Sequence, residues 1–276
     1  MGNRIVIYTI IIIICIACLG IGIYAQFFYK YSDKDTFLTG NVDEEIKTEE
    51  MYQNLKNNFD TIFNNKVNGI SNLDELMKKE QTEDIVYTIQ TVKESQNGRY
   101  DLNINIPHIN LDTNGIAEIN KEIEDIFVTK LESIMEQTNS YTIYNIDYVA
   151  YINQNIISLI IKATLKEGQN SQRLIIKTYN YDVEKQALIS IDEVLEMKEL
   201  DKNNVQSKIK EEIEKVYNEN LAFEQAGYTV YKRDIQSSMY EVENVDTFFL
   251  GQNGYLYILY PYGNSNYTSE IDIIIF

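Results

Sequence analysis

The chain has 276 residues, with 42 acidic and 24 basic side chains and a formal net charge of −18 at pH 7. Its hydrophobic fraction of 44%, which includes 22 Tyr and 10 Phe residues, excludes a disordered composition, so we expect a folded body. The negative charge repels nucleic acid and anionic lipid headgroups and excludes both as expected partners, although it also simply keeps a domain soluble.

The first segment, residues 5–28, carries no charge and is rich in Ile. At about 1.5 Å per residue it is long enough to cross a hydrocarbon core of about 30 Å. We interpret it as a transmembrane anchor that follows a cytoplasmic tip, residues 1–4, and places the C-terminal domain outside the cell membrane. A cleaved signal peptide is the alternative, although the run is longer than the usual apolar region of such peptides. Basic residues on both flanks leave the orientation open from charge alone.

Residues 29–82 are interpreted as a linker with juxtamembrane helices. Between residues 43 and 64 apolar side chains recur every three or four positions, which is typical of an amphipathic helix. A shorter helix is expected over residues 71–80. Both cysteines, Cys15 and Cys18, lie in the apolar run, so no disulfide is expected in the body.

The next part of the chain alternates apolar and polar residues and predicts strands. Residues 84–94 and 99–107 are expected to form a hairpin, because Asn97-Gly98 tolerates the positive φ angles of a tight turn. A long amphipathic helix is predicted over residues 113–137. Short turns then separate three further strands, which predicts antiparallel neighbours. These strands are residues 141–152, 156–167 and 173–183.

The last part contains a short helix at residues 190–197, capped by Ser190, and a second long helix at residues 201–220. Strands return at residues 246–262 and 269–276. The predicted fold is α+β, with a largely antiparallel sheet packed against two long helices and preceded by the N-terminal transmembrane helix. The extracytoplasmic domain is expected to span residues 83–276.

Three pieces of this succession carry a resemblance to a known family: residues 100–123, residues 148–195 and residues 248–275. The first holds "NIPHINLDTNGIAEIN", the second "YINQNIISLIIKA" and "KTYNYDV", and the third "GQNGYLYILYPYGNSNY". Their order resembles the extracytoplasmic domain of the lysozyme-sensing anti-sigma factor family of Gram-positive bacteria, also found beside peptidoglycan deacetylase domains. The resemblance implies an exterior domain and a lysozyme-like basic protein or peptidoglycan as partner. Residues 1–4 depart from the family pattern, because they are too few for its sigma-binding segment.

No catalytic constellation, metal site or cofactor motif is visible in the sequence. His108 is the single histidine, and a nucleophile–histidine site or a His/Cys zinc site needs partners that the body lacks. We therefore expect no enzyme. Carboxylate pairs of the kind that a glycosidase uses are plentiful, but they fall on predicted polar helix faces. They are Glu44-Glu45, Glu122 with Glu124, and Glu211-Glu212 with Glu214.

The candidate ligand-binding residues are tyrosines near the C-terminus: Tyr255, Tyr257, Tyr260, Tyr262 and Tyr267. In a strand the first two share one face and the next two share the other, so one pair should pack on the helices while the other could be exposed. Ordinary sheet packing is the simpler interpretation, since Tyr is favoured in strands. The alternative is a surface that binds protein or glycan, with the turn at residues 260–267 as its loop.

The sequence thus favours a membrane-anchored extracytoplasmic binding or sensing domain for a lysozyme-like basic protein or cell-wall material. A cell-wall hydrolase that uses two carboxylates and a structural partner of another envelope protein are the alternatives.

Overall fold

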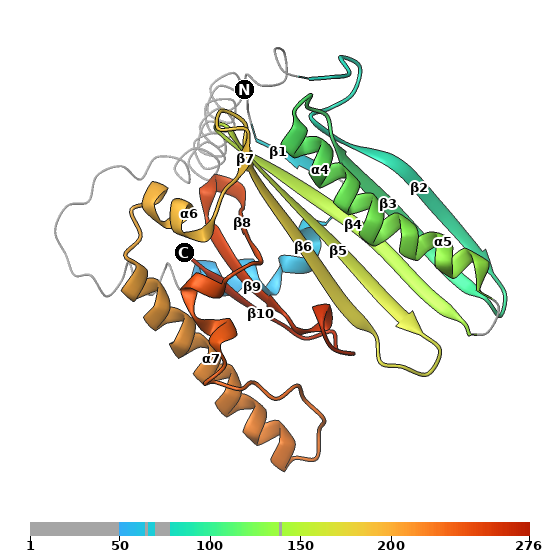
Figure 1. Ribbon diagram of the computed structural model, residues 1–276. Helices are drawn as coiled ribbons and strands as arrows, with labels where there is room; N and C mark the ends of the chain where they lie inside the picture. Colours follow the sequence, from blue (N-terminus) through green and yellow to red (C-terminus); the bar gives the residue numbers. More distant parts are fainter. Residues whose placement is uncertain (1–49, 64–65, 70–77, 138–139) are drawn as a thin grey trace, which may run out of the picture. The chain divides into compact units, whose positions relative to one another are not determined.

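The computed structural model describes residues 50–63, 66–69, 78–137 and 140–276 (Figure 1). The predicted anchor at residues 5–28, most of the linker and residues 71–77 of the predicted short helix lie outside the described residues. Residues 52–276 belong to one compact unit. Within the described ranges, no helix is both long enough and apolar enough to cross a membrane.

A mixed sheet of seven strands forms the centre of this unit. Its path runs β2-β3-β4-β5-β6-β7, and β1 pairs with β4 beside that path. Most neighbours are antiparallel, as predicted, but β3 and β1 each run parallel to β4. The strands are β1 (Lys66–Asn68), β2 (Val86–Gln96), β3 (Tyr100–Ile109), β4 (Thr142–Asn153), β5 (Ile156–Glu167), β6 (Arg173–Asp182) and β7 (Ala187–Leu188).

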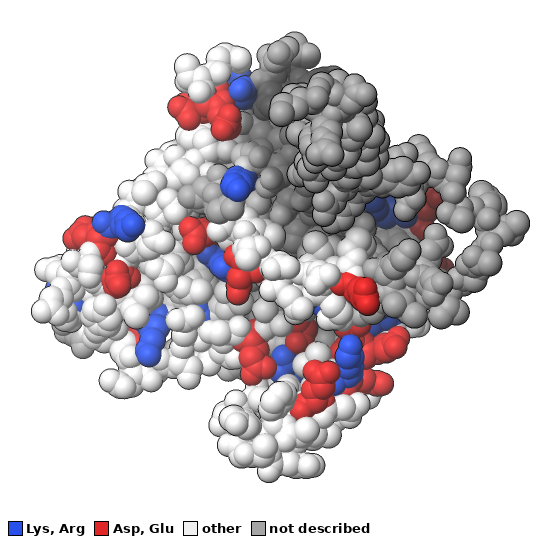
Figure 2. Space-filling model, turned by 180° about the vertical axis from the view of Figure 1, so that it is seen from behind, with Lys and Arg blue, Asp and Glu red and all other residues white. Residues whose placement is uncertain are grey.

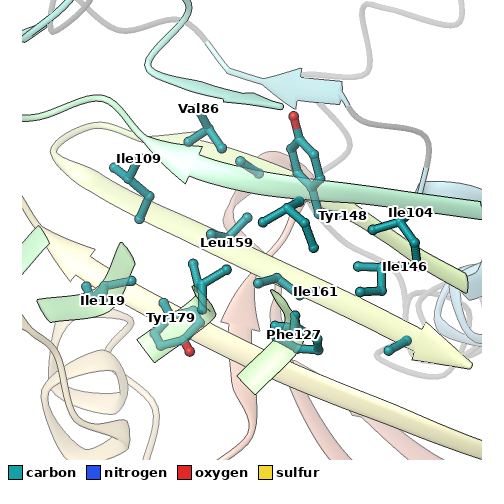
Figure 3. Packing of buried hydrophobic residues seen from close by; sticks show 14 of the residues in the cluster. Val86, Ile104, Ile109, Ile119, Phe127, Ile146, Tyr148, Leu159, Ile161 and Tyr179 are labelled. Carbon is teal, nitrogen blue, oxygen red and sulfur yellow. The ribbon is translucent and has the colours of Figure 1, made fainter. Parts of the chain in front are cut away.

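The long helix predicted at residues 113–137 is present and crosses over between the parallel strands β3 and β4. It consists of α4 (Asn114–Ile123), a π-helical turn labelled η3 (Glu124–Val128) and α5 (Thr129–Glu136). Figure 3 shows Ile119 and Phe127 of this helix packed over the sheet side chains Ile161 and Tyr179. The wider π-helical turn changes which side chains face the sheet, and the apolar Ile126 and Met135 are exposed.

The closing strands form a separate sheet of three strands, in the order β10-β9-β8, so the single predicted sheet is wrong. The strands are β8 (Phe248–Leu250), β9 (Leu256–Pro261) and β10 (Ile271–Ile275). One face packs on the large sheet, where Phe249, Leu259 and Ile275 meet Tyr151 and Ile160. The other face packs on two helices, α6 (Ile191–Met197) and α7 (Lys202–Gln225). The two long helices therefore cover different sheets.

Polar side chains of the large sheet bond the free edge of β8. Leu250 N donates to Ser158 Oγ (3.2 Å) and Phe248 N donates to Thr178 Oγ1 (3.2 Å). Asn180 Nδ2 donates to Phe248 O at 2.7 Å. These bonds satisfy backbone groups that an edge strand otherwise leaves unpaired, and they explain why polar residues lie between two apolar sheets.

Candidate functional site

The structure buries most of the tyrosines that the sequence singled out. Tyr255 and Tyr257 lie on one face of the small sheet and Tyr260 and Tyr262 on the other, as strand alternation predicts. Neither face is open, because the large sheet covers the first and helices cover the second. Burial raises the pKa of Tyr257 to about 12. Tyr267 differs from them, since it remains 55% exposed.

Tyr267 borders a surface groove of about 500 Å³ that we call the Tyr267 groove. Its lining comes from three segments, residues 171–172, 229–231 and 266–270. Hydroxyl and amide side chains predominate there, and Glu270 is the single charged residue of the lining. A ligand in this groove meets neutral hydrogen-bonding groups and an aromatic ring.

The loop that carries Tyr267 is fixed to the outer edge of β6. Asn264 accepts from Ile176 N through Oδ1 (3.0 Å) and donates to Ile176 O through Nδ2 (3.1 Å), much as a neighbouring strand would. Arg173 Nε donates to Gly263 O (2.9 Å), and its guanidinium lies 5.4 Å from the centre of the Tyr267 ring. The predicted loop at residues 260–267 therefore has a structural role, and it also presents the Tyr267 ring at the surface.

A buried ion-pair network behind the groove joins its two sides. Arg233 donates to Asp272 through Nη2 (2.8 Å) and Nε (3.1 Å), to Glu270, and to Tyr231 O (2.8 Å). Glu270 also accepts from Tyr231 N at 2.6 Å. Burial opposes the charge on Arg233, but its hydrogen bonds to the carboxylates of Asp272 and Glu270 outweigh that effect, so the pKa of Arg233 is raised. The segment around Tyr231 is thereby held against β10.

Two buried hydroxyls extend this network. Tyr262 donates to Asp272 and lies 2.7 Å from the hydroxyl of Tyr240, and its ring stacks on Tyr231 at 4.2 Å. Burial and the charge of Asp272 raise the pKa of Tyr262. Arg233 was not among the residues that the sequence pattern singled out. The available signal was an Arg in a chain whose basic residues are mostly Lys, because a guanidinium suits buried bidentate pairing.

The end of α7 projects next to the groove and carries exposed apolar side chains. We call Leu221, Phe223 and Tyr228 the aromatic tip; the last two rings meet edge to face and are 52% and 66% exposed. Residues 221–231 contain one charged side chain, Glu224. The projecting end at the bottom of Figure 2 is accordingly almost free of charge, while acidic and basic side chains gather above it. The following residues, 229–231, enter the groove wall.

Three of the remaining candidates have structural partners, while Glu44 and Glu45 lie outside the described residues. His108 is half-buried, lies beside Tyr87 and approaches Asn120 at 3.4 Å, and burial lowers its pKa. Glu122 pairs with Lys177, and Glu212 pairs with Lys56. Across the described residues, no group of three or more His, Cys, Asp or Glu side chains is arranged to hold a metal ion.

No family model matches the chain, and no curated protein matches it. Among the solved structures that resemble this chain is a DUF3298 family protein from Pseudomonas aeruginosa. The two sequences are 10% identical, the TM-score is 0.38, and the match covers 73% of this chain and 91% of that one. A DUF3298 member from Bacteroides fragilis is 12% identical, with a TM-score of 0.33, covering 63% of this chain and 82% of that one. Likeness at this level carries no argument about the site.

Proposed function

We propose that the chain is a membrane-anchored extracytoplasmic binding or sensing domain, held by residues 5–28, whose ligand docks on the aromatic tip and the Tyr267 groove. The ligand that we favour is a lysozyme-like basic protein. The observation that carries this proposal is an exposed aromatic surface with few charges on a chain with a net charge of −18.

The aromatic side chains supply the affinity in this proposal. Binding energy at protein interfaces concentrates in a few large anchors, with Trp, Tyr and Arg enriched among them. Phe223, Tyr228 and Tyr267 already stand out of the core, so they lose no packing when a partner covers them. The acidic body supplies the attraction, since complementary charge raises association rates and is screened by salt.

A cell-wall glycan is the second candidate, and the lining of the Tyr267 groove favours it. Ser171, Gln172 and Asn266 offer hydroxyl and amide groups to sugar hydroxyls, and the Tyr267 ring offers an apolar face. A hydrolase with two carboxylates finds less support in this groove, because Glu270 is its one acidic lining residue. The same exposed surface also suits the third candidate function, in which the chain is a structural partner of another envelope protein.

Calorimetry of the full chain in detergent micelles tests the proposal. Egg-white lysozyme should bind saturably, and more weakly at about 300 mM salt than at about 50 mM. Phe223→Ala with Tyr228→Ala should weaken binding at least about tenfold, while Tyr141→Ala, which also removes an exposed ring, should leave it unchanged. Equal binding by both variants would reject the aromatic surface. Binding of N-acetylglucosamine oligomers without lysozyme binding would favour the glycan.

A further inference from the structure

The outer edge of the small sheet, strand β10, has unpaired backbone groups. Phe276 and Leu256 exchange both backbone hydrogen bonds (2.9 and 3.0 Å), and Tyr262 N donates to Glu270 O. The alternation of an antiparallel ladder therefore directs the N–H and C=O groups of Ile271 and Ile273 away from β9. Within the described part of the chain, these groups have no hydrogen-bond partner.

A preformed slot of about 410 Å³ lies beside this edge. We call it the β10 slot: its floor is Ile271–Ile274, one wall is residues 212–219 of α7, and the other wall is residues 53–60. Residues 53–57 of that second wall are helical, and Phe59 packs into the core behind them. The ion pair between Lys56 and Glu212 (2.7 Å) joins the two walls and fixes their separation.

We propose that the β10 slot captures an extended segment of a basic partner protein as a fourth strand of the small sheet. An extended segment is the ligand whose own N–H and C=O groups match the outward groups of Ile271 and Ile273. Val216 on the α7 wall and Ile271 and Ile273 on the floor are partly exposed apolar side chains, so side chains of the segment find apolar contacts there.

The charge of the occupant follows from the chain as a whole. Four acidic side chains line the slot, Asp60, Glu212, Glu219 and Asp272, together with two basic ones, Lys56 and Lys215. The net charge of −18 then favours a segment flanked by basic residues. The inference goes beyond the proposed function, because it requires neither the Tyr267 groove nor the aromatic tip.

Hydrogen exchange of the full chain in detergent micelles provides the test. The probe is an acetylated, amidated heptapeptide, Lys-Val-Thr-Val-Thr-Val-Lys, and its control has Pro in place of the central Val, which cannot donate and breaks the strand. Saturating probe should slow exchange at the amides of Ile271 and Ile273 about tenfold, and the control peptide should not. Asp272 and Ile274, already bonded to β9, serve as internal references.

Two chain variants sharpen the result. Ile273→Pro removes an outward N–H at an edge position, where Pro is tolerated, and should weaken probe binding about tenfold; Ile273→Val keeps the N–H and should bind normally. Unchanged exchange at Ile271 and Ile273 with saturating probe would overturn the proposal. Protection of these amides without probe, together with a dimer mass in light scattering, would overturn the assigned partner and point to a second copy of this chain.

Discussion

Replacement of Arg233 by Met should strongly destabilise the domain. The Arg233 side chain is 3% exposed and that of Asp272 is 7% exposed, so the substitution leaves a buried carboxylate without its cation. Removing one member of a buried pair costs about 3–5 kcal/mol, and the lower end applies here because Tyr262 still donates to Asp272. We therefore expect the free energy of unfolding, measured by urea titration with circular dichroism, to fall by about 3 kcal/mol.

Two controls separate this effect from a general loss of positive charge. Lys232→Met removes a neighbouring cation whose ion pair with Glu224 is exposed, and it should cost less than about 0.5 kcal/mol. Adding Asp272→Asn to Arg233→Met removes the unpaired charge and should recover at least about 1 kcal/mol relative to the single variant. A loss below about 1 kcal/mol for Arg233→Met would refute the assigned role of the network.

Three other predictions concern separate parts of the fold. Gly263→Ala places a Cβ about 2.1 Å from Leu174 O and should lower the melting temperature, with a cost of about 1–3 kcal/mol; an unchanged melt would contradict the tight loop contact. Hydrogen bonds from Ser190 and Lys185 hold the pKa of Glu193 at about 2. The ionised carboxylate should therefore contribute fully to the stability of the folded state above about pH 4.5, and this contribution should be lost as the pH falls toward 2. Ser190→Ala should cost about 1 kcal/mol at neutral pH and raise the Glu193 pKa in an NMR titration, and an unaltered titration would argue against the capping box. Burial lowers the pKa of His108 below its ordinary 6.5, so stability should fall as the pH drops below about 6.5; His108→Gln should reduce this fall, and identical pH profiles in urea titrations would contradict it.

Local signals in the sequence predicted the elements that depend on nearby residues. Asn97-Gly98 indicated the β2–β3 hairpin, and Gly98 indeed has a φ of 76°. Ser190 indicated the start of α6, where the structure has a complete capping box. Alternation along β9 indicated which tyrosines share a face. Each of these features is set by interactions within a few residues of the chain.

Features that depend on distant contacts escaped the sequence analysis. The parallel pairing of β3 with β4 follows from the helical crossover, and alternating patterns do not distinguish it from antiparallel pairing. The division into two sheets depends on bonds such as that from Asn180 to Phe248, 68 residues apart. The groove has the same origin, since Gln172, Tyr231 and Tyr267 come from three separate segments.

The bonds between the large sheet and β8 lead us to expect an order of events in folding. Ser158 lies on β5, whereas Thr178 and Asn180 lie on β6. These three side chains are therefore placed next to one another only when β5 and β6 have paired. In a refolding experiment, the amides of β5 and β6 should gain protection before those of Phe248 and Leu250. We therefore expect the large sheet to serve as the template on which the last 30 or so residues of the chain assemble.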